Sequence, residues 1–172
     1  EGILTTGCAG GIRYEVILPV QREKRSGSKI SVRIHGLSGG HSGTEIHKQR
    51  GNANKMMGRF LYRLAKEVSF SLISINGGTK DNVITPDTTA EIIVEKGREN
   101  AVHAAAEEME KIWNDEFMGE EPGLKVDVFA SEVSDCEAME KVSTERVVSY
   151  LMLCPTGCRN LTERSRAWWR LR

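Results

Sequence analysis

The stretch Gly-Leu-Ser-Gly-Gly-His-Ser-Gly-Thr-Glu-Ile-His, residues 36–47, decides how the rest of the chain is interpreted. Glycine costs conformational entropy and buries nothing, so its repetition here suits a backbone that needs positive φ or a close approach to a bulky group. His41 lies inside this glycine-rich segment, directly ahead of a helical pattern. Such a histidine either points at a ligand or is a structural histidine satisfied within the protein, and the segment alone leaves both open.

Apolar periodicity on both sides of this loop predicts a mixture of strands and helices. Alternation with period 2 predicts strands, over residues 12–20, 30–34, 70–75, 89–94 and 124–130. A period of 3.6 predicts helices, over residues 53–65 and 143–153 and between Gly97 and Pro122, with Asn52 and Ser143 as N-caps of the first and last. The charged residues 21–28 predict a hairpin-like loop, and the polar residues 131–142 predict another loop.

From residue 30 onward the predicted order is strand, helix, strand, strand, helix, strand. This is the split βαβ order of ferredoxin-like folds. We therefore expect an α+β protein with a ferredoxin-like βαββαβ core, in which one antiparallel sheet carries two helices on one face. The strand over residues 12–20 is expected to be an extra N-terminal edge strand.

The composition is that of an ordinary soluble protein. Hydrophobic residues make up 39% and charged residues 28% of the 172 residues. Lys and Arg together number 24, as do Asp and Glu, so no net field attracts nucleic acid or an anionic membrane. No apolar run approaches the roughly 20 residues that span a bilayer. The scattered cysteines Cys8, Cys136, Cys154 and Cys158 are expected to be free thiols, and a reducing cytoplasm is the expected location.

Three motifs together resemble one family. They are residues 36–47 with Gly-Asn-Ala-Asn-Lys at 51–55, then Glu1-Gly2 with Gly7-Cys8-Ala9-Gly10-Gly11, and Asn76-Gly77-Gly78-Thr79 with Asn82-Val83-Ile84-Thr85-Pro86. In this order and spacing they resemble the lid domain of the aminoacyl-histidine dipeptidases, also called peptidase D or cytosol non-specific dipeptidases, which are two-zinc metallopeptidases. The resemblance covers roughly residues 1–157.

The resemblance implies a domain organisation. Residues 1–12 are expected to be a connector from a missing catalytic domain, and residues 13–157 an incomplete lid, or dimerisation, domain. Residues 158–172 depart from the family, which continues with Gly-Leu-Val-Glu-Thr-Ser. A shift of reading frame across residues 166–172 would restore that motif, so we expect an aberrant, frameshifted tail. The rival interpretation is that its arginines and Trp168-Trp169 bind nucleic acid.

The resemblance also implies an activity that this chain would share only in part. The full enzyme is expected to hydrolyse dipeptides with metal-activated water and to hold two zinc ions. The family's His-x-Asp and Glu-Glu metal motifs are absent from the sequence, and His41 and His47 lack the ligand spacing of a zinc site. The fragment is therefore expected to bind no metal, to be inactive alone, and to pair as a homodimer through the lid, without nucleic acid or membrane.

Individual residues receive roles by the same resemblance. His41 is expected to donate a hydrogen bond to the substrate carbonyl oxygen as that oxygen becomes negative. Asn82 is expected to hold the substrate's terminal carboxylate, although it can also be a turn residue ahead of a strand. Gly39, Gly40 and Gly43 are assigned to the shape of the loop, which lets His41 approach the ligand.

One alternative belongs to a different class of protein. A stand-alone ferredoxin-like module that binds a small molecule, with the glycine-rich loop around an effector, fits the same pattern of elements. Flanking DNA that encodes the metal motifs would favour the lid, whereas a native start codon near Glu1 would favour the module.

Overall fold

The computed structural model describes residues 15–156, apart from the side chains of residues 132–134. Its elements are β1 (Arg22–His35), β2 (Gly40–His41), a 3₁₀ turn (Ile46–Lys48), α1 (Ala53–Leu64), β3 (Phe70–Gly77), β4 (Val83–Ile84), β5 (Thr88–Val94), α2 (Glu99–Phe117), β6 (Lys125–Met139) and α3 (Lys141–Leu153). The expected connector over residues 1–12 and the expected aberrant tail over residues 158–172 lie outside the described residues.

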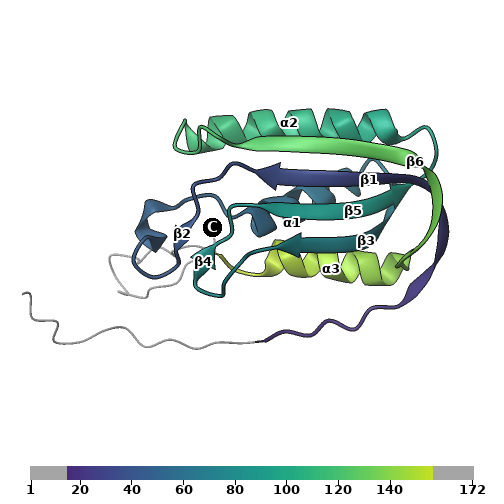
Figure 1. Ribbon diagram of the computed structural model, residues 1–172, viewed down its shortest axis with the longest axis horizontal. Coiled ribbons are helices and arrows are strands. Elements are labelled where there is room, and N and C mark those ends of the chain that lie inside the picture. The colour runs from purple at the N-terminus through teal and green to yellow at the C-terminus, as the bar shows by residue number, and fades with distance from the viewer. Residues whose placement is uncertain (1–14, 157–172) are drawn as a thin grey trace, which may run out of the picture.

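The four long strands form one antiparallel sheet in the order β3-β5-β1-β6 (Figure 1). With α1 between β1 and β3, and α2 between β5 and β6, this is the ferredoxin-like arrangement. α1 packs against both α2 and α3, and all three helices contribute to one core with the sheet. The predicted fold class is confirmed, with α3 as an additional helix.

The core lies between one face of the sheet and these helices. Ile30, Val32 and Ile34 alternate along β1 and are all fully buried, which the period of two places on a single face. Phe60 from α1 and Trp113 from α2 are the largest fully buried side chains opposite them. Within residues 15–156 no helix combines the length and the apolar character needed to cross a membrane.

The first long strand starts earlier than its polar sequence predicts. Residues 22–28 were expected to be a loop, but they pair in register with residues 133–139, which were also expected to be a loop. Polar side chains do not prevent this pairing, because the ladder is made by backbone groups. The Ser-Gly-Ser break is absorbed by a register shift between Ser28 and Ile30, and a Cβ on Gly27 would lie only 2.3 Å from the Val94 carbonyl oxygen.

The predicted N-terminal edge strand is wrong wherever the structure tests it. Residues 15–21 form no strand, and residues 12–14 lie outside the described part. Leu18 and Val20 are partly buried against the core, so their alternation reflects an extended segment that packs on the domain without joining the sheet. The backbone N–H of Gln21 donates to Ser143 Oγ at 2.8 Å, which fastens the end of this segment to α3.

Two predicted helix caps have different outcomes. Asn52 caps α1 as predicted, because its side-chain oxygen accepts a hydrogen bond from Lys55 N at 3.2 Å. Ser143 is not the cap of α3, which begins two residues earlier at Lys141 with Glu140 in the cap position. The Ser143 hydroxyl is used by Gln21, and this tertiary contact could not be read from the local sequence.

The contact between α1 and α3 yields a test of the packing. Gly58 lies within α1, where alanine ordinarily stabilises a helix by about 1 kcal/mol relative to glycine. Here a Cβ would lie 2.7 Å from Leu151 Cβ and 3.0 Å from the Leu151 carbonyl carbon. Gly58→Ala should therefore lower the free energy of unfolding by about 1–3 kcal/mol in urea denaturation, as overpacking does. A double-mutant cycle with Leu151→Gly should show coupling, and an increase in stability would contradict the close packing.

Candidate functional site

The structure brings the loops of His41 and Asn82 side by side. The short strands β2 and β4 pair antiparallel, with Gly40 opposite Ile84 and His41 opposite Val83. Next to this pair, Ser42 N donates to the Asn82 carbonyl oxygen at 2.9 Å. The side chains of His41 and Asn82 are both exposed. Two residues that are 41 positions apart in the sequence therefore lie on adjoining exposed loops.

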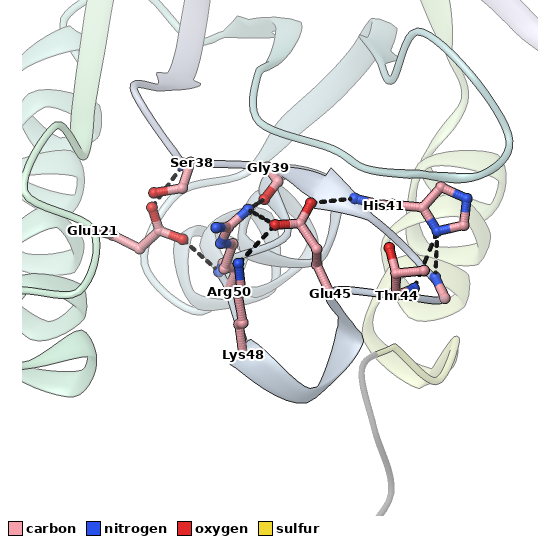
Figure 2. Close-up of polar contacts among 10 residues, drawn as sticks. Ser38, Gly39, His41, Thr44, Glu45, Lys48, Arg50 and Glu121 are labelled. Carbon is pink, nitrogen blue, oxygen red and sulfur yellow. Dashed lines mark hydrogen bonds and ion pairs between the residues drawn. The ribbon is translucent and has the colours of Figure 1, made fainter. Parts of the chain in front are cut away.

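The imidazole of His41 is held by the loop that follows it. The backbone N–H groups of Gly43 and Thr44 both donate to His41 Nδ1, at 3.0 and 3.2 Å (Figure 2). A ring nitrogen that accepts two hydrogen bonds carries no proton, so the proton of the neutral imidazole is on Nε2. In Figure 2 the other ring nitrogen points away from these amides. The exposed Nε2–H is thus a donor available to a ligand.

The glycines of the loop make room for polar contacts around His41. Gly39 and Gly40 have φ values of 60° and 137°, in the region that favours glycine. A Cβ on Gly40 would lie 2.6 Å from Arg50 Nη1 and 2.8 Å from Glu45 Oε2. A Cβ on Gly43 would lie 3.1 Å from His41 Cε1, so a side chain there would press on the ring.

Glu45 organises the loop, and the sequence analysis did not identify it. Its carboxylate accepts a hydrogen bond from His41 N at 3.0 Å and from Lys48 Nζ at 2.8 Å. Arg50 Nη1 lies 3.2 Å from the same carboxylate and donates to the Gly39 carbonyl oxygen at 2.5 Å. The hydrogen bond from Lys48, then that from His41 N and the charge of Arg50, lower the pKa of Glu45 to about 2. Lys48, three residues later, was the available signal in the sequence.

Glu121 is the second residue that sequence reasoning missed. It lies between α2 and β6 and is only 2% exposed. Its Oε2 accepts from Ser38 N at 2.7 Å and its Oε1 accepts from Gly51 N at 2.9 Å, as Figure 2 shows for Ser38. One carboxylate therefore holds both ends of the segment that carries His41.

A polar network connects the start of α1 with the segment after β4. Asn54 Oδ1 accepts from Thr88 Oγ1 at 2.5 Å, and Asn54 Nδ2 donates to Thr85 Oγ1 at 3.3 Å. The backbone N–H of Ala53 donates to the Thr85 carbonyl oxygen at 2.8 Å. Gly77 leaves the space for this network, because a Cβ there would lie 2.2 Å from Asn54 Oδ1. The network sets the place of the Asn82 loop relative to α1.

The residues that the structure describes do not fit a metal site. Among residues 15–156 no three His, Cys, Asp or Glu side chains are grouped so that they could hold a metal ion. The imidazole of His41 has its Nδ1 occupied by two amides, and the carboxylate of Glu45 is bound to cations. No chemical step is therefore assigned to a metal held by these residues.

The family of the chain follows from comparison with known proteins. Residues 32–121 match the peptidase dimerisation domain, and the chain belongs to this family. The chain is 33% identical over 159 residues to the cytosol non-specific dipeptidase of Escherichia coli (strain K12), an alignment that covers 91% of this chain. It also resembles the crystal structure of aminoacylhistidine dipeptidase from Vibrio alginolyticus, with a TM-score of 0.75 and 25% identity over 85% of the chain.

The chain corresponds to only part of these relatives. It spans 33% of the Escherichia coli protein and 30% of the Vibrio alginolyticus protein. Both relatives are dipeptidases, so the resemblance stated from the sequence motifs is confirmed, and a stand-alone small-molecule-binding module is not favoured.

The low pKa of Glu45 predicts how pH affects this loop. Because the folded-state pKa is about 2 against an ordinary 4.5, ionised Glu45 stabilises the folded loop above pH 4.5, and this contribution is lost as the pH falls from 4.5 through about 2. The wild-type chain should therefore be more stable than Glu45→Gln at neutral pH, and the difference should vanish over that range. Urea denaturation at several pH values measures it.

A control identifies the cause of this pH dependence. The hydrogen bond from Lys48 is the largest contribution to the lowered pKa of Glu45. In a Lys48→Met background the effect of Glu45→Gln should therefore be smaller at neutral pH. A difference between wild type and Glu45→Gln that is the same at every pH would contradict the assignment.

Proposed function

We propose that residues 13–157 are the lid, or dimerisation, part of a zinc-dependent cytosolic dipeptidase of the aminoacyl-histidine type. The whole enzyme hydrolyses dipeptides that have a free carboxyl terminus. What supports the proposal is membership of the peptidase dimerisation domain family together with similarity to two dipeptidases over most of the chain. In the assembled enzyme the lid pairs with the lid of a second subunit.

The proposal divides the chemistry between this chain and a catalytic domain. The catalytic domain supplies the metal ligands and the carboxylate that activates water, and residues 1–12 connect it to the lid. When bound there, zinc makes water nucleophilic at neutral pH and polarises the scissile carbonyl. On this proposal, the chain without that catalytic domain is inactive in peptide hydrolysis.

His41 is the residue of this chain that contacts the reacting group. Its Nε2–H donates to the carbonyl oxygen of the substrate, which becomes negative as water adds to the carbon. Two observations support this role: the side chain is exposed, and the amides of Gly43 and Thr44 on Nδ1 leave the proton on Nε2. A donor that is already oriented needs no reorganisation during the reaction, which is how oxyanion stabilisation lowers a barrier.

Asn82 is proposed to hold the free carboxylate of the dipeptide. Its backbone carbonyl accepts the Ser42 N–H, so the residue is placed next to the His41 loop while its side chain is exposed. The side-chain amide has two N–H donors, which suits a carboxylate acceptor. With His41 at the scissile carbonyl of the first residue and Asn82 at the terminal carboxylate of the second, the two loops would bind both residues of the dipeptide.

The role of His41 can be tested in a chimeric enzyme. The segment of the Escherichia coli dipeptidase that aligns with this chain is replaced by residues 1–157, and dipeptide hydrolysis is assayed with zinc. His41→Ala should lower kcat about 100- to 1000-fold, the usual cost of removing an oxyanion donor, with little change in KM. His47→Ala, in the exposed 3₁₀ turn nearby, is the matched control and should leave kcat unchanged. Equal effects of the two substitutions would refute the role.

The role of Asn82 predicts a different kinetic change. Asn82→Ala should raise KM about tenfold or more for a dipeptide with a free carboxylate, because it removes a hydrogen bond to a charged group. For the corresponding dipeptide amide, KM should change much less. Asn114→Ala is the control, since Asn114 Nδ2 donates within α2 to the Glu110 carbonyl oxygen at 3.0 Å. A KM that rises equally for both substrates would argue against carboxylate recognition.

A further inference from the structure

The buried carboxylate of Glu121 has no role in the function proposed above. Ionised carboxylates are costly to bury unless hydrogen bonds replace the lost water. Acidic residues just beyond the C-terminal end of a helix also meet unfavourable electrostatics from the helix carbonyls. Glu121 follows α2 and is 2% exposed, whereas the adjacent Glu120 is exposed. Of these two neighbouring glutamates, only Glu121 is buried in the protein.

Close backbone packing brings Glu121 to the loop. Gly36, at φ 79°, and Gly123 lie backbone against backbone, because a Cβ on Gly36 would be 1.8 Å from the Gly123 carbonyl oxygen. A Cβ on Gly123 would likewise be 2.6 Å from the Gly36 carbonyl oxygen. The turn after α2 thereby approaches the start of the loop closely enough for the Glu121 carboxylate to reach the backbone N–H of Ser38.

The two hydrogen bonds of Glu121 act at the base of the loop that carries His41. Ser38 N and Gly51 N, which donate to its two oxygens, precede and follow the residues that surround His41. Gly39 follows Ser38 in the chain, and Arg50 precedes Gly51. The guanidinium of Arg50 donates a hydrogen bond to the Gly39 carbonyl oxygen at 2.5 Å. Arg50 then pairs with Glu45, which accepts the His41 N–H. The contacts thus run without interruption from Glu121 to the backbone of His41.

We propose that Glu121 is a positioning residue for His41. By holding both ends of the loop, it restricts the conformations in which the Gly43 and Thr44 amides can bind Nδ1, and so keeps the proton of His41 on Nε2. Its importance for catalysis rests on the proposed function of His41, whereas its effect on the His41 ring does not. It contacts neither substrate nor reacting atoms.

The substitution Glu121→Gln tests this role with little change in volume. A glutamine has one oxygen that can accept an N–H, but its amide nitrogen only donates, so Ser38 N or Gly51 N loses its acceptor. Glu120→Gln makes the same change of charge at the neighbouring exposed position and is the matched control. Both variants are made in the 172-residue chain and compared with wild type by proton–nitrogen correlation spectra of the histidine rings. His41→Gln assigns the signals of His41.

The expected result is specific to the ring. Wild type and Glu120→Gln should show His41 with Nδ1 unprotonated, whereas Glu121→Gln should show signals averaged between the two tautomers. Amide hydrogen exchange at Gly43 and Thr44 should accelerate about tenfold in Glu121→Gln, as expected for loss of one hydrogen bond to a charged group. A purely structural role would lower thermal stability without moving the His41 ring signals, and unchanged signals and exchange rates in Glu121→Gln overturn the proposal.

A measurement on the wild-type chain covers the case in which Glu121→Gln does not fold. The amides of Ser38 and Gly51 should exchange slowly compared with that of the exposed Gly119, and equally fast exchange overturns the proposal. In the chimeric enzyme, Glu121→Gln should lower kcat more than it raises KM. If His41→Ala leaves kcat unchanged, the proposed function fails, while the ring spectra still decide whether Glu121 positions His41.

Discussion

The pairing of β1 with two neighbours at once is the interaction on which the rest of the domain depends. β1 hydrogen-bonds to β5 on one side and to β6 on the other, so its backbone groups are satisfied on both edges within the shared register. Ile30, Val32 and Ile34 on its inner face then anchor the core under the helices. Because this strand is paired on both sides, the glycine-rich loop that follows His35 starts from a well-defined point.

Polar side chains hold the segments that follow β1 in place. Glu121 reaches the loop from the end of α2, and Asn54 reaches Thr85 and Thr88 from the start of α1. Both connections depend on positions without a Cβ, at Gly36 in one case and Gly77 in the other. The exposed loops of His41 and Asn82 are therefore held by β1, α1 and α2. Functional residues on loops are commonly positioned by a scaffold of helices and strands in this way.

The sequence predicted the parts of this structure that depend on local pattern. The alternation in residues 30–34 and the apolar stripe of α1 identified core elements and their order, because burial of one face imposes a period. Pairing of the polar residues 22–28 with 133–139 was missed, since the ladder is made by backbone groups and residues 22–26 carry exposed side chains with no apolar alternation. Glu121 was missed for a related reason. Its partners are backbone amides of a distant segment, and the side chains of that segment give no sign in the sequence that these amides bind a carboxylate.

The way Glu121 holds the loop has a consequence for how such a loop can evolve. Its two contacts are to main-chain N–H groups, which every residue except proline provides. The two hydrogen bonds of Glu121 therefore do not involve the side chains between Ser38 and Gly51. A substitution at an exposed position between them, such as Ser42 or His47, can therefore change what the loop presents while the two attachment points stay where they are.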